Sequence, residues 1–289
     1  MKTTREDIVM DQASALQGSG KQVKVIAVAS GKGGVGKTNT VINVAASLAA
    51  EGARVMVLDA DLGLGNLDVM LGLAPQYNLQ HLFAGEKKLA EIIVEGPHGV
   101  KIIPAASGIQ EVTRGGTREQ RILMEQLNQY ADQIDFLLID AAAGISDMVT
   151  SFVMAADVAL IVATPEPTSM TDAYALMKVL WNRYGEKKFY LLLNQVSDEA
   201  QARQVYSQLS RVGEKFLDIT LVFLGYVPKD KAVPMAVCRQ QAVVIYKPEA
   251  AASRAFVEVA RRLKRLPFKV RGGGLSYFWQ RLLGGESRE

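Results

Sequence analysis

The stretch Gly31-Lys32-Gly33-Gly34-Val35-Gly36-Lys37-Thr38 decides the fold of this 289-residue chain. It matches the pattern G-x-x-x-x-G-K-[ST], and it stands between an apolar strand-like run and a helix-length segment. In that context the glycines let successive backbone N–H groups point at phosphate oxygens, and the following helix adds its positive N-terminal end. We therefore predict that the loop, together with Asn39, binds phosphate groups. Lys37 is expected on the β- and γ-phosphates and the Thr38 hydroxyl on Mg²⁺.

Short apolar runs alternate with helix-length segments along most of the chain. Helical segments are expected at 37–51, 117–132, 170–184 and 198–213. The seven strand-like runs are KVIAVAS, RVMVLDA, VKIIPAA, DFLLIDA, VALIVATP, FYLLLNQ and LVFLGYVP. Runs that are apolar on both faces are typical of a parallel sheet with helices on both sides. We predict an α/β fold: a doubly wound, mostly parallel sheet of about seven or eight strands.

The predicted body spans residues 23–267 and is flanked by two different ends. Residues 1–22 are polar with a Gly/Ser joint and are expected to form a flexible arm, and residues 268–289 form a separate tail. No apolar run approaches the ~20 residues of a membrane-spanning helix. Met1–Gln12 lacks the features of a secretory signal, so we expect a protein inside the cell.

Several kinds of chemistry are disfavoured by composition. The single cysteine, Cys238, excludes an internal disulfide framework, and His81 and His98 have no partner at metal-ligand spacing. The formal net charge of +3 is too small to predict nucleic-acid binding by itself.

Carboxylates follow two of the predicted strands. Asp59 and Asp61 end RVMVLDA and lead into a Gly-rich segment, and Asp140 ends DFLLIDA. Ligands of doubly wound sheets bind beyond the carboxyl ends of the strands, so these side chains suit a magnesium nucleotide. Aspartates that only cap turns remain the alternative for Asp59 and Asp61, and Asp135, which precedes its strand, is expected to be a cap.

Candidates for base recognition follow the last two strands. Asn194 lies near the end of the run FYLLLNQ. Pro228 ends the run LVFLGYVP, and Lys229 and Asp230 follow it directly. A side-chain amide both donates and accepts, which suits the edge of adenine. An asparagine that caps a strand end is the alternative, so these residues do not decide between adenine and guanine.

The tail combines a glycine hinge at 272–274 with an apolar helical stripe. The stripe has the spacing i, i+3, i+4, i+7 and i+8 and consists of Leu275, Phe278, Trp279, Leu282 and Leu283. Basic residues precede it: Arg261, Arg262, Lys264, Arg265, Lys269 and Arg271. An exposed stripe with this makeup predicts a helix that lies in an anionic membrane surface. A helix docked on the body is the alternative.

The phosphate loop, with its extra lysine Lys32, resembles the deviant Walker A loop of the MinD/ParA family. This resemblance implies ATP or ADP and Mg²⁺ as cofactors and a homodimer in the ATP state, in which Lys32 reaches the phosphates of the partner. It implies that Asp61 orients the attacking water while Asp59 supports the magnesium environment. Lys32, Lys37 and Asp61 are thus the implied catalytic residues.

The same resemblance implies further roles around the nucleotide. Asp140 matches the Walker B aspartate and is expected to reach Mg²⁺ through water, and Gly144 is expected to sense the γ-phosphate. Asn194 is the implied adenine reader, and Pro165 and Thr168 are expected near nucleotide and partner. The family often has a hydroxyl or a proline where this chain has Ala141, Ala142 and Ala143, so no side-chain hydroxyl role is expected there.

The arm carries Asp11-Gln12-Ala13-Ser14-Ala15-Leu16, which resembles the DQAxxL motif of flagellar-number regulators of the FlhG type, also called FleN or YlxH. Segments 100–108 and 166–180 resemble the same branch. The resemblance implies that Asp11, Gln12 and Ala13 activate an FlhF-type GTPase, and that flagellar basal-body and C-ring proteins are partners. It implies a cytoplasmic protein that is peripheral on the inner face of the membrane in its ATP state, because dimerisation doubles the weak anchors.

Three other functions use the same loop. A division-site selector of the MinD type shares the chemistry, and the Gln12 arm is the feature against it. A ParA-type DNA-partitioning ATPase would use the basic residues at 261–271, although we regard nucleic acid as an unlikely partner. A metabolic P-loop enzyme is disfavoured because no substrate-specific catalytic cluster appears beyond the phosphate loop.

Overall fold

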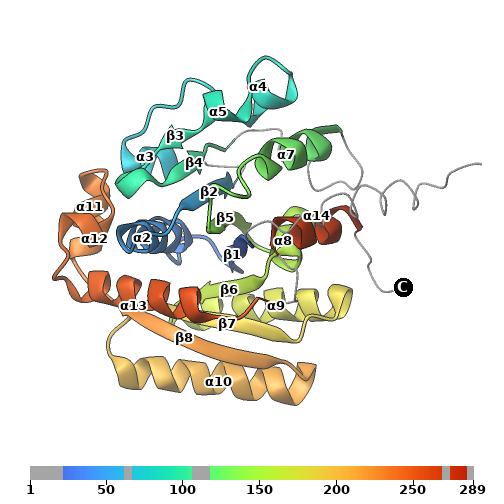
Figure 1. Cartoon of the computed structure of the whole chain (residues 1–289). Coiled ribbons are helices and arrows are strands. Elements are labelled where there is room, and N and C mark those ends of the chain that lie inside the picture. Colours follow the sequence, from blue (N-terminus) through green and yellow to red (C-terminus); the bar gives the residue numbers. More distant parts are fainter. Residues whose placement is uncertain (1–21, 62–66, 106–117, 269–273, 285–289) are drawn as a thin grey trace, which may run out of the picture.

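The computed structural model describes residues 22–61, 67–105, 118–268 and 274–284. Within them an eight-stranded sheet has the order β3-β4-β2-β5-β1-β6-β7-β8 (Figure 1). The strands are β1 Lys24–Ser30, β2 Val55–Ala60, β3 Val94–Glu95, β4 Lys101–Ile103, β5 Phe136–Ala143, β6 Val158–Ala163, β7 Lys188–Val196 and β8 Thr220–Pro228. All seven predicted runs form strands, and they pair in parallel. The eighth strand, β3, is antiparallel and only two residues long, which is too short for a periodicity to reveal it.

Helices cover both faces of the sheet, as predicted. One face carries α2 (Lys37–Ala50), α3 (Leu67–Leu71), α11 (Ala232–Cys238), α12 (Val243–Tyr246) and α13 (Ala251–Arg265). The other face carries α4 (Leu79–Phe83), α5 (Leu89–Ile92), α7 (Arg118–Asn128), α8 (Asp147–Ala155), α9 (Pro167–Tyr184), α10 (Glu199–Leu217) and α14 (Leu275–Gly284). A short 3₁₀ turn, η1, spans Pro97–Gly99. No helix in these described ranges is long and apolar enough to cross a membrane.

Strand β1 is the centre of the sheet. Every residue of KVIAVAS is buried, because the strand lies between β5 and β6 and has helices over both faces. The chain leaves β1 toward β2 on one side and reaches β6 on the other, so the strand order reverses at β1. Such a reversal opens the crevice in which doubly wound sheets bind ligands. The phosphate loop, which directly follows Ser30, therefore lies at that crevice.

The opposite end of β1 is fixed by a buried lysine. The ammonium of Lys24 donates to the carbonyl oxygens of Leu263 (3.3 Å), Lys264 (3.0 Å) and Leu266 (2.5 Å). These carbonyls end α13, and the last carbonyls of a helix have no partner within the helix. Burial lowers the pKa of Lys24, while nearby Asp157 opposes this effect. The lysine thereby clamps the C-terminus of α13 to the central strand.

Helix α14 is docked on the body, which corrects the prediction of an exposed apolar stripe. Leu275, Phe278, Trp279 and Leu282 are buried in the core that α8 shares. The ring of Phe278 stacks on Phe152 of α8 with centroids 6.3 Å apart, and α14 also packs against α7 and β1. The side chain of Leu283 lies outside the described part. Helical spacing identified the shared face correctly, but spacing carries no information about what covers that face.

We expect Phe278→Ala to lower the free energy of unfolding by about 3–5 kcal/mol, the usual cost of emptying a core phenylalanine site. Phe278 is 1% exposed, whereas Phe216 on α10 is 61% exposed and provides the matched control. Phe216→Ala should cost no more than about 0.5 kcal/mol. Urea unfolding of the two variants and the parent measures the difference. Equal, small effects of both substitutions would show that α14 is not part of the folded core in solution.

Candidate nucleotide site

The phosphate loop needs glycine where it touches the rest of the fold. A Cβ atom on Gly31 would lie 2.1 Å from the backbone oxygen of Asp172 in α9, so no other residue fits. Gly36 has φ +89° and immediately precedes the first residue of α2, Lys37. L-residues rarely adopt that backbone conformation. The loop is thus held closely against α9 and turns directly into the N-terminus of a helix, the arrangement that binds phosphate.

The side chain of Asn194, near the end of β7, holds the phosphate loop. Its Nδ2 donates to the carbonyl oxygen of Val35 (2.8 Å), and its Oδ1 accepts from the backbone N–H of Gln195 (2.9 Å). A Cβ atom on Gly36 would come within 2.2 Å of the same Nδ2. The structure therefore gives this buried amide the strand-end capping role that was the alternative to base reading. It adds a function that the sequence did not reveal, since the amide ties the loop to the end of β7.

Lys37 lies among carboxylates. Its ammonium contacts Asp140 Oδ1 at 2.7 Å and Asp61 Oδ2 at 3.9 Å. Asp59 and Asp140 are register partners in neighbouring strands, and Asp59 accepts from the backbone N–H of Asp61 (3.1 Å). Thr38 hydrogen-bonds to Asp140 as well. The structure thus brings together the predicted residues Lys37, Thr38, Asp59, Asp61 and Asp140.

The site carries more negative than positive charge when its acids are ionised. Burial and the neighbouring Asp140 raise the pKa of Asp59 to about 7. Burial also raises the pKa of Asp140, although Lys37 opposes this shift. For both carboxylates burial is the largest cause, and the charge of Lys37 offsets it only in part.

The donor set fits a magnesium nucleotide. No group of three or more acid, histidine or cysteine side chains within the described residues is arranged to hold a metal ion alone. Mg²⁺ in phosphate sites needs no such cage, because one or two carboxylates, phosphate oxygens and waters complete its shell. The raised pKa of Asp59 shows that this pair of strand ends would favour an added cation.

Lys32, the second lysine of the loop, is turned toward its own chain. Its ammonium contacts Glu166 Oε2 and Thr168 Oγ1, both at 3.0 Å, at the beginning of α9. Thr168 was a predicted site residue, and Pro165 lies in the same loop. Glu166 was missed, although it is the only acid in the segment 164–171. Lys32 is 39% exposed and Glu166 is 65% exposed, so the pair contributes at most about 1 kcal/mol and opens readily.

Asp230 has a structural role that the sequence did not predict. Its carboxylate accepts from the backbone N–H groups of Ala232 (2.8 Å) and Ala252 (3.2 Å), which lowers its pKa. It therefore caps the start of α11 and of α13. Pro228 ends β8, and the backbone N–H of Lys229 donates to the carbonyl oxygen of Val196. Asp135 is a cap as predicted, because it accepts from the backbone and side chain of Arg54.

Similarity to known proteins agrees with this geometry. A family model described as an AAA domain matches residues 23–188. The chain is 43% identical to the "Antiactivator FleN" of Pseudomonas aeruginosa over 267 residues, which cover 92% of this chain and 95% of that protein. The chain belongs to the MinD/ParA family of P-loop ATPases.

Two further matches support the family and the fold. The chain is 33% identical to the "Flagellum site-determining protein YlxH" of Helicobacter pylori over 271 residues, 90% of each protein. A solved MinC:MinD cell division protein complex from Aquifex aeolicus matches 87% of this chain and 100% of that chain, with a TM-score of 0.69 and 27% identity. The sheet order and the two helical layers are thus those of MinD/ParA ATPases.

The two segments expected to act as switches follow Asp61 and β5. Asp61 is the last described residue before 62–66, which lie outside the described part. Gly144 follows β5 with φ +103°, and its backbone N–H donates to the carbonyl oxygen of Ser30 (2.9 Å). The arm residues Asp11, Gln12 and Ala13 also lie outside the described residues.

We expect the stability of the nucleotide-free, magnesium-free protein to fall between pH 6 and pH 8. Asp59 titrates near pH 7 in the folded state and near 3.8 when unperturbed, so its contribution is fully present below pH 3.8 and is lost as the pH rises to 7. Proton linkage at Asp59 lowers the free energy of unfolding by roughly 1 kcal/mol between pH 6 and pH 8. Asp59→Asn should remove that part of the decline in urea unfolding, whereas Asp132→Asn, at an exposed position, should leave it unchanged. An identical decline in all three proteins would contradict the assignment.

We expect Asn194→Ala to weaken binding of Mg²⁺-tripolyphosphate as strongly as binding of Mg²⁺-ATP. The amide holds the carbonyl of Val35, and losing one buried hydrogen bond of this kind reduces affinity by about tenfold. Titration calorimetry with both ligands tests this, since tripolyphosphate has no base. If only ATP binding weakened, Asn194 would be a base reader and not a support of the loop.

Proposed function

We propose that this chain is a Mg²⁺-dependent ATPase that dimerises around ATP and, as a membrane-associated switch, regulates the number and placement of flagella. The observation that carries the proposal is the second lysine, Lys32, in a phosphate loop of a chain 43% identical to an antiactivator FleN. Lys32 is not needed to complete the phosphate loop, because Lys37 and the backbone already do so. A partly exposed cation on the outer side of that loop suits the phosphates of a second subunit.

The site residues divide the catalytic work. Lys37 exchanges Asp140 for the β- and γ-phosphates, while Thr38 and Asp140 hold the ion and Asp59 supports them. Bound Mg²⁺ supplies positive charge to the β- and γ-oxygens. Asp61, at the end of β2, orients the attacking water, since phosphoryl transfer depends mostly on positioning and electrostatics. Hydrolysis removes the γ-phosphate from Lys37, and release of ADP would return the lysine to its carboxylate partners.

Dimerisation couples the second lysine to the nucleotide. Lys32 leaves Glu166 and Thr168, a contact of low stability, and reaches the phosphates of the partner subunit. Ile145, which follows Gly144, is 49% exposed beside the same strand ends and offers apolar surface for the contact. ATP therefore favours the dimer, because its γ-phosphate gives Lys32 a negatively charged partner in place of Glu166.

Membrane attachment requires release of α14. The helix buries its apolar face, but the indole N–H of Trp279 is buried there and has no hydrogen-bond partner among the described residues. An unpaired buried donor costs about 1–3 kcal/mol, which weakens the docked state. A released α14 presents Leu275, Phe278 and Trp279 to the lipid. Because one short amphipathic helix binds weakly, the two helices of a dimer bind an anionic membrane far more strongly than one.

The flagellar role is supported by similarity to the flagellum site-determining protein YlxH of Helicobacter pylori. The arm, through Gln12, activates an FlhF-type GTPase. The protein also binds flagellar basal-body or C-ring proteins. The protein is then cytoplasmic and lies on the inner membrane face in its ATP state. A division-site function is the second candidate, supported by similarity to the MinD subunit of the Aquifex aeolicus complex.

One sedimentation experiment with anionic liposomes tests the switch. We expect the parent chain to co-sediment with ATP but not with ADP, Lys32→Ala to remain monomeric and unbound with ATP, and Asp61→Ala to stay dimeric and bound because hydrolysis is blocked. Light scattering of the same samples without lipid reports dimer formation separately from attachment. Normal ATP hydrolysis by Asp61→Ala would refute its catalytic role, and attachment of Lys32→Ala equal to the parent would refute the dimer-controlled switch.

A further inference from the structure

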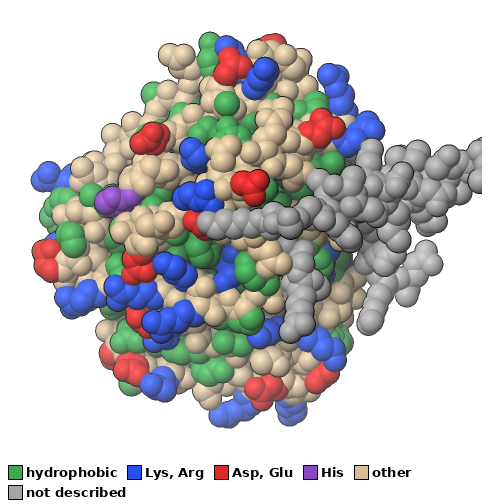
Figure 2. Space-filling view, in the orientation of Figure 1, with side chains coloured by type: hydrophobic (Ala, Val, Ile, Leu, Met, Phe, Trp, Pro, Cys, Tyr) green, Lys and Arg blue, Asp and Glu red, His purple; other side chains and the backbone are tan. Residues whose placement is uncertain are grey.

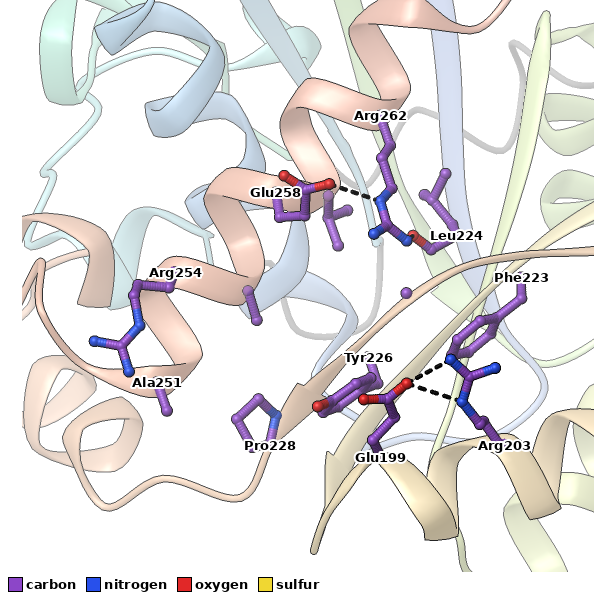
Figure 3. A pocket seen from close by; sticks show the side chains of 13 residues that line it. Glu199, Arg203, Phe223, Leu224, Tyr226, Pro228, Ala251, Arg254, Glu258 and Arg262 are labelled. Carbon is purple, nitrogen blue, oxygen red and sulfur yellow. Dashed lines mark hydrogen bonds and ion pairs between the residues drawn. The ribbon is translucent and has the colours of Figure 1, made fainter.

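A groove runs along the edge of the sheet at β8. Strands β6 and β7 separate it from β1, which leads into the phosphate loop. Strand β8 forms its floor, and helices α10 and α13 form its walls from opposite faces of the sheet (Figure 3). The cavity measures about 510 Å³. Small residues line it, Gly225 on the β8 floor and Ala251 and Ala255 on the α13 wall, so the space is not filled by the protein itself. We call this surface the β8-edge groove.

The floor of the groove is an edge strand that is covered over only part of its length. The carbonyl oxygen of Leu221 accepts from the hydroxyl of Tyr206 (3.0 Å), and that of Leu224 accepts from Arg262 (2.9 Å). A bulge at Leu224 shifts the register with β7, and beyond it Gly225, Tyr226 and Pro228 line the groove. Edge strands present backbone N–H and C=O groups to which another extended segment can add. The part of β8 after the bulge is therefore a template for one short strand.

The walls of the groove carry an excess of positive charge. Arg203 pairs with Glu199 (2.8 Å) on α10, and Arg262 pairs with Glu258 (2.9 Å) on α13. Arg254 donates to the main-chain carbonyl oxygen of Glu249 and not to a carboxylate. Three arginines and two glutamates leave one positive charge. Helical i, i+4 pairs at the surface contribute only about 0.5 kcal/mol, so an entering carboxylate competes with them readily.

The geometry points to an extended, acidic segment of a partner protein as the occupant of the β8-edge groove. Side chains of a strand that adds to β8 alternate between the two faces of the sheet. Two consecutive acidic residues in that segment therefore face opposite walls, one toward Arg203 on α10 and the other toward Arg254 on α13. The ligand is a segment with an adjacent acidic pair flanked by residues that favour strands.

Nucleic acid fits this surface less well than an acidic peptide. Figure 2 shows basic and acidic side chains side by side over the region of α13 and α10, not a continuous basic field. Binding to nucleic acid relies on several lysines and arginines that neutralise successive phosphates. One excess positive charge and a backbone edge instead match a peptide, which contributes both carboxylates and main-chain hydrogen bonds.

Selection from a library of random eight-residue peptides displayed on phage tests the proposal without knowledge of the partner. The intact chain is the target, and the variants Arg254→Glu and Ala255→Trp are counter-targets that reverse the wall charge and fill the groove. Arg211→Glu on the outside of α10 is the matched control, because it makes the same change of charge away from the groove. Unaltered ATP affinity of all variants shows that they are folded.

We expect the selected sequences to contain adjacent acidic residues and to bind as synthetic peptides. Their affinity should fall by about tenfold with Arg254→Glu, be lost with Ala255→Trp and be unchanged with Arg211→Glu. Bound peptide should slow hydrogen exchange of the amides of Gly225 and Tyr226, which a merely electrostatic contact would not do.

Three outcomes would overturn the proposal. Recovery of no sequence that distinguishes the intact chain from Ala255→Trp would show that the groove binds no extended segment. Binding that leaves the exchange of Gly225 and Tyr226 unchanged would exclude strand addition. Competition by a short oligothymidylate, with the same dependence on Arg254, would assign the groove to phosphate-rich ligands instead. None of these results depends on dimerisation or membrane attachment, so failure here leaves the proposed switch intact.

Discussion

The buried ammonium of Lys37 is the charge on which the site depends. Parallel pairing of β2 with β5 forces Asp59 and Asp140 into adjacent positions, and both carboxylates are nearly inaccessible to solvent. Lys37 compensates only one of them directly, through its 2.7 Å contact with Asp140. Buried ion pairs stabilise a fold weakly, because desolvation offsets their attraction. The arrangement is therefore better explained by its ligand than by stability, since a magnesium nucleotide supplies both the missing cation and a new partner for the lysine.

Strand β1 connects this site to the tail. Its carboxyl end enters the phosphate loop, and its first residue, Lys24, with the preceding Val23 holds the chain at the end of α13 and at Gly274. Lys24 binds the carbonyls that end α13, and the Cα of Gly274 packs so closely on Val23 that an added Cβ would lie 2.9 Å from the Val23 carbonyl oxygen. A strand buried along its whole length transmits displacement better than a loop does. The fold thus provides one rigid element between nucleotide and the docked helix α14.

The sequence predicted those parts of the fold whose cause is local. Runs such as FLLI are apolar on both faces, short and bounded by polar residues, which favours buried strands, and the phosphate loop has a conformation that its glycines require. Contacts between distant segments were not predictable in the same way. The pairing of Lys32 with Glu166, the support of Val35 by Asn194 and the caps made by Asp230 depend on how strands and helices meet. The docking of α14 stood only as the alternative for the same reason, because an amphipathic pattern fits a protein core and a membrane surface equally well.

The three surfaces of the molecule are separated by the sheet itself. The phosphate loop lies at the strand ends, α14 lies over β1 on the face of α7 and α8, and the β8-edge groove opens at the lateral edge. A dimer built on the strand ends leaves both other surfaces accessible, since neither shares a residue with the phosphate loop. Release of α14 exposes the apolar surface of α8 around Phe152, and exposed apolar surface of this kind is costly in water. The released state therefore requires a compensating contact, and insertion of Phe278 and Trp279 into lipid offsets only the helix side of that cost. The α8 side needs its own cover, so in the proposed membrane-bound dimer a partner protein would gain most by binding beside α8.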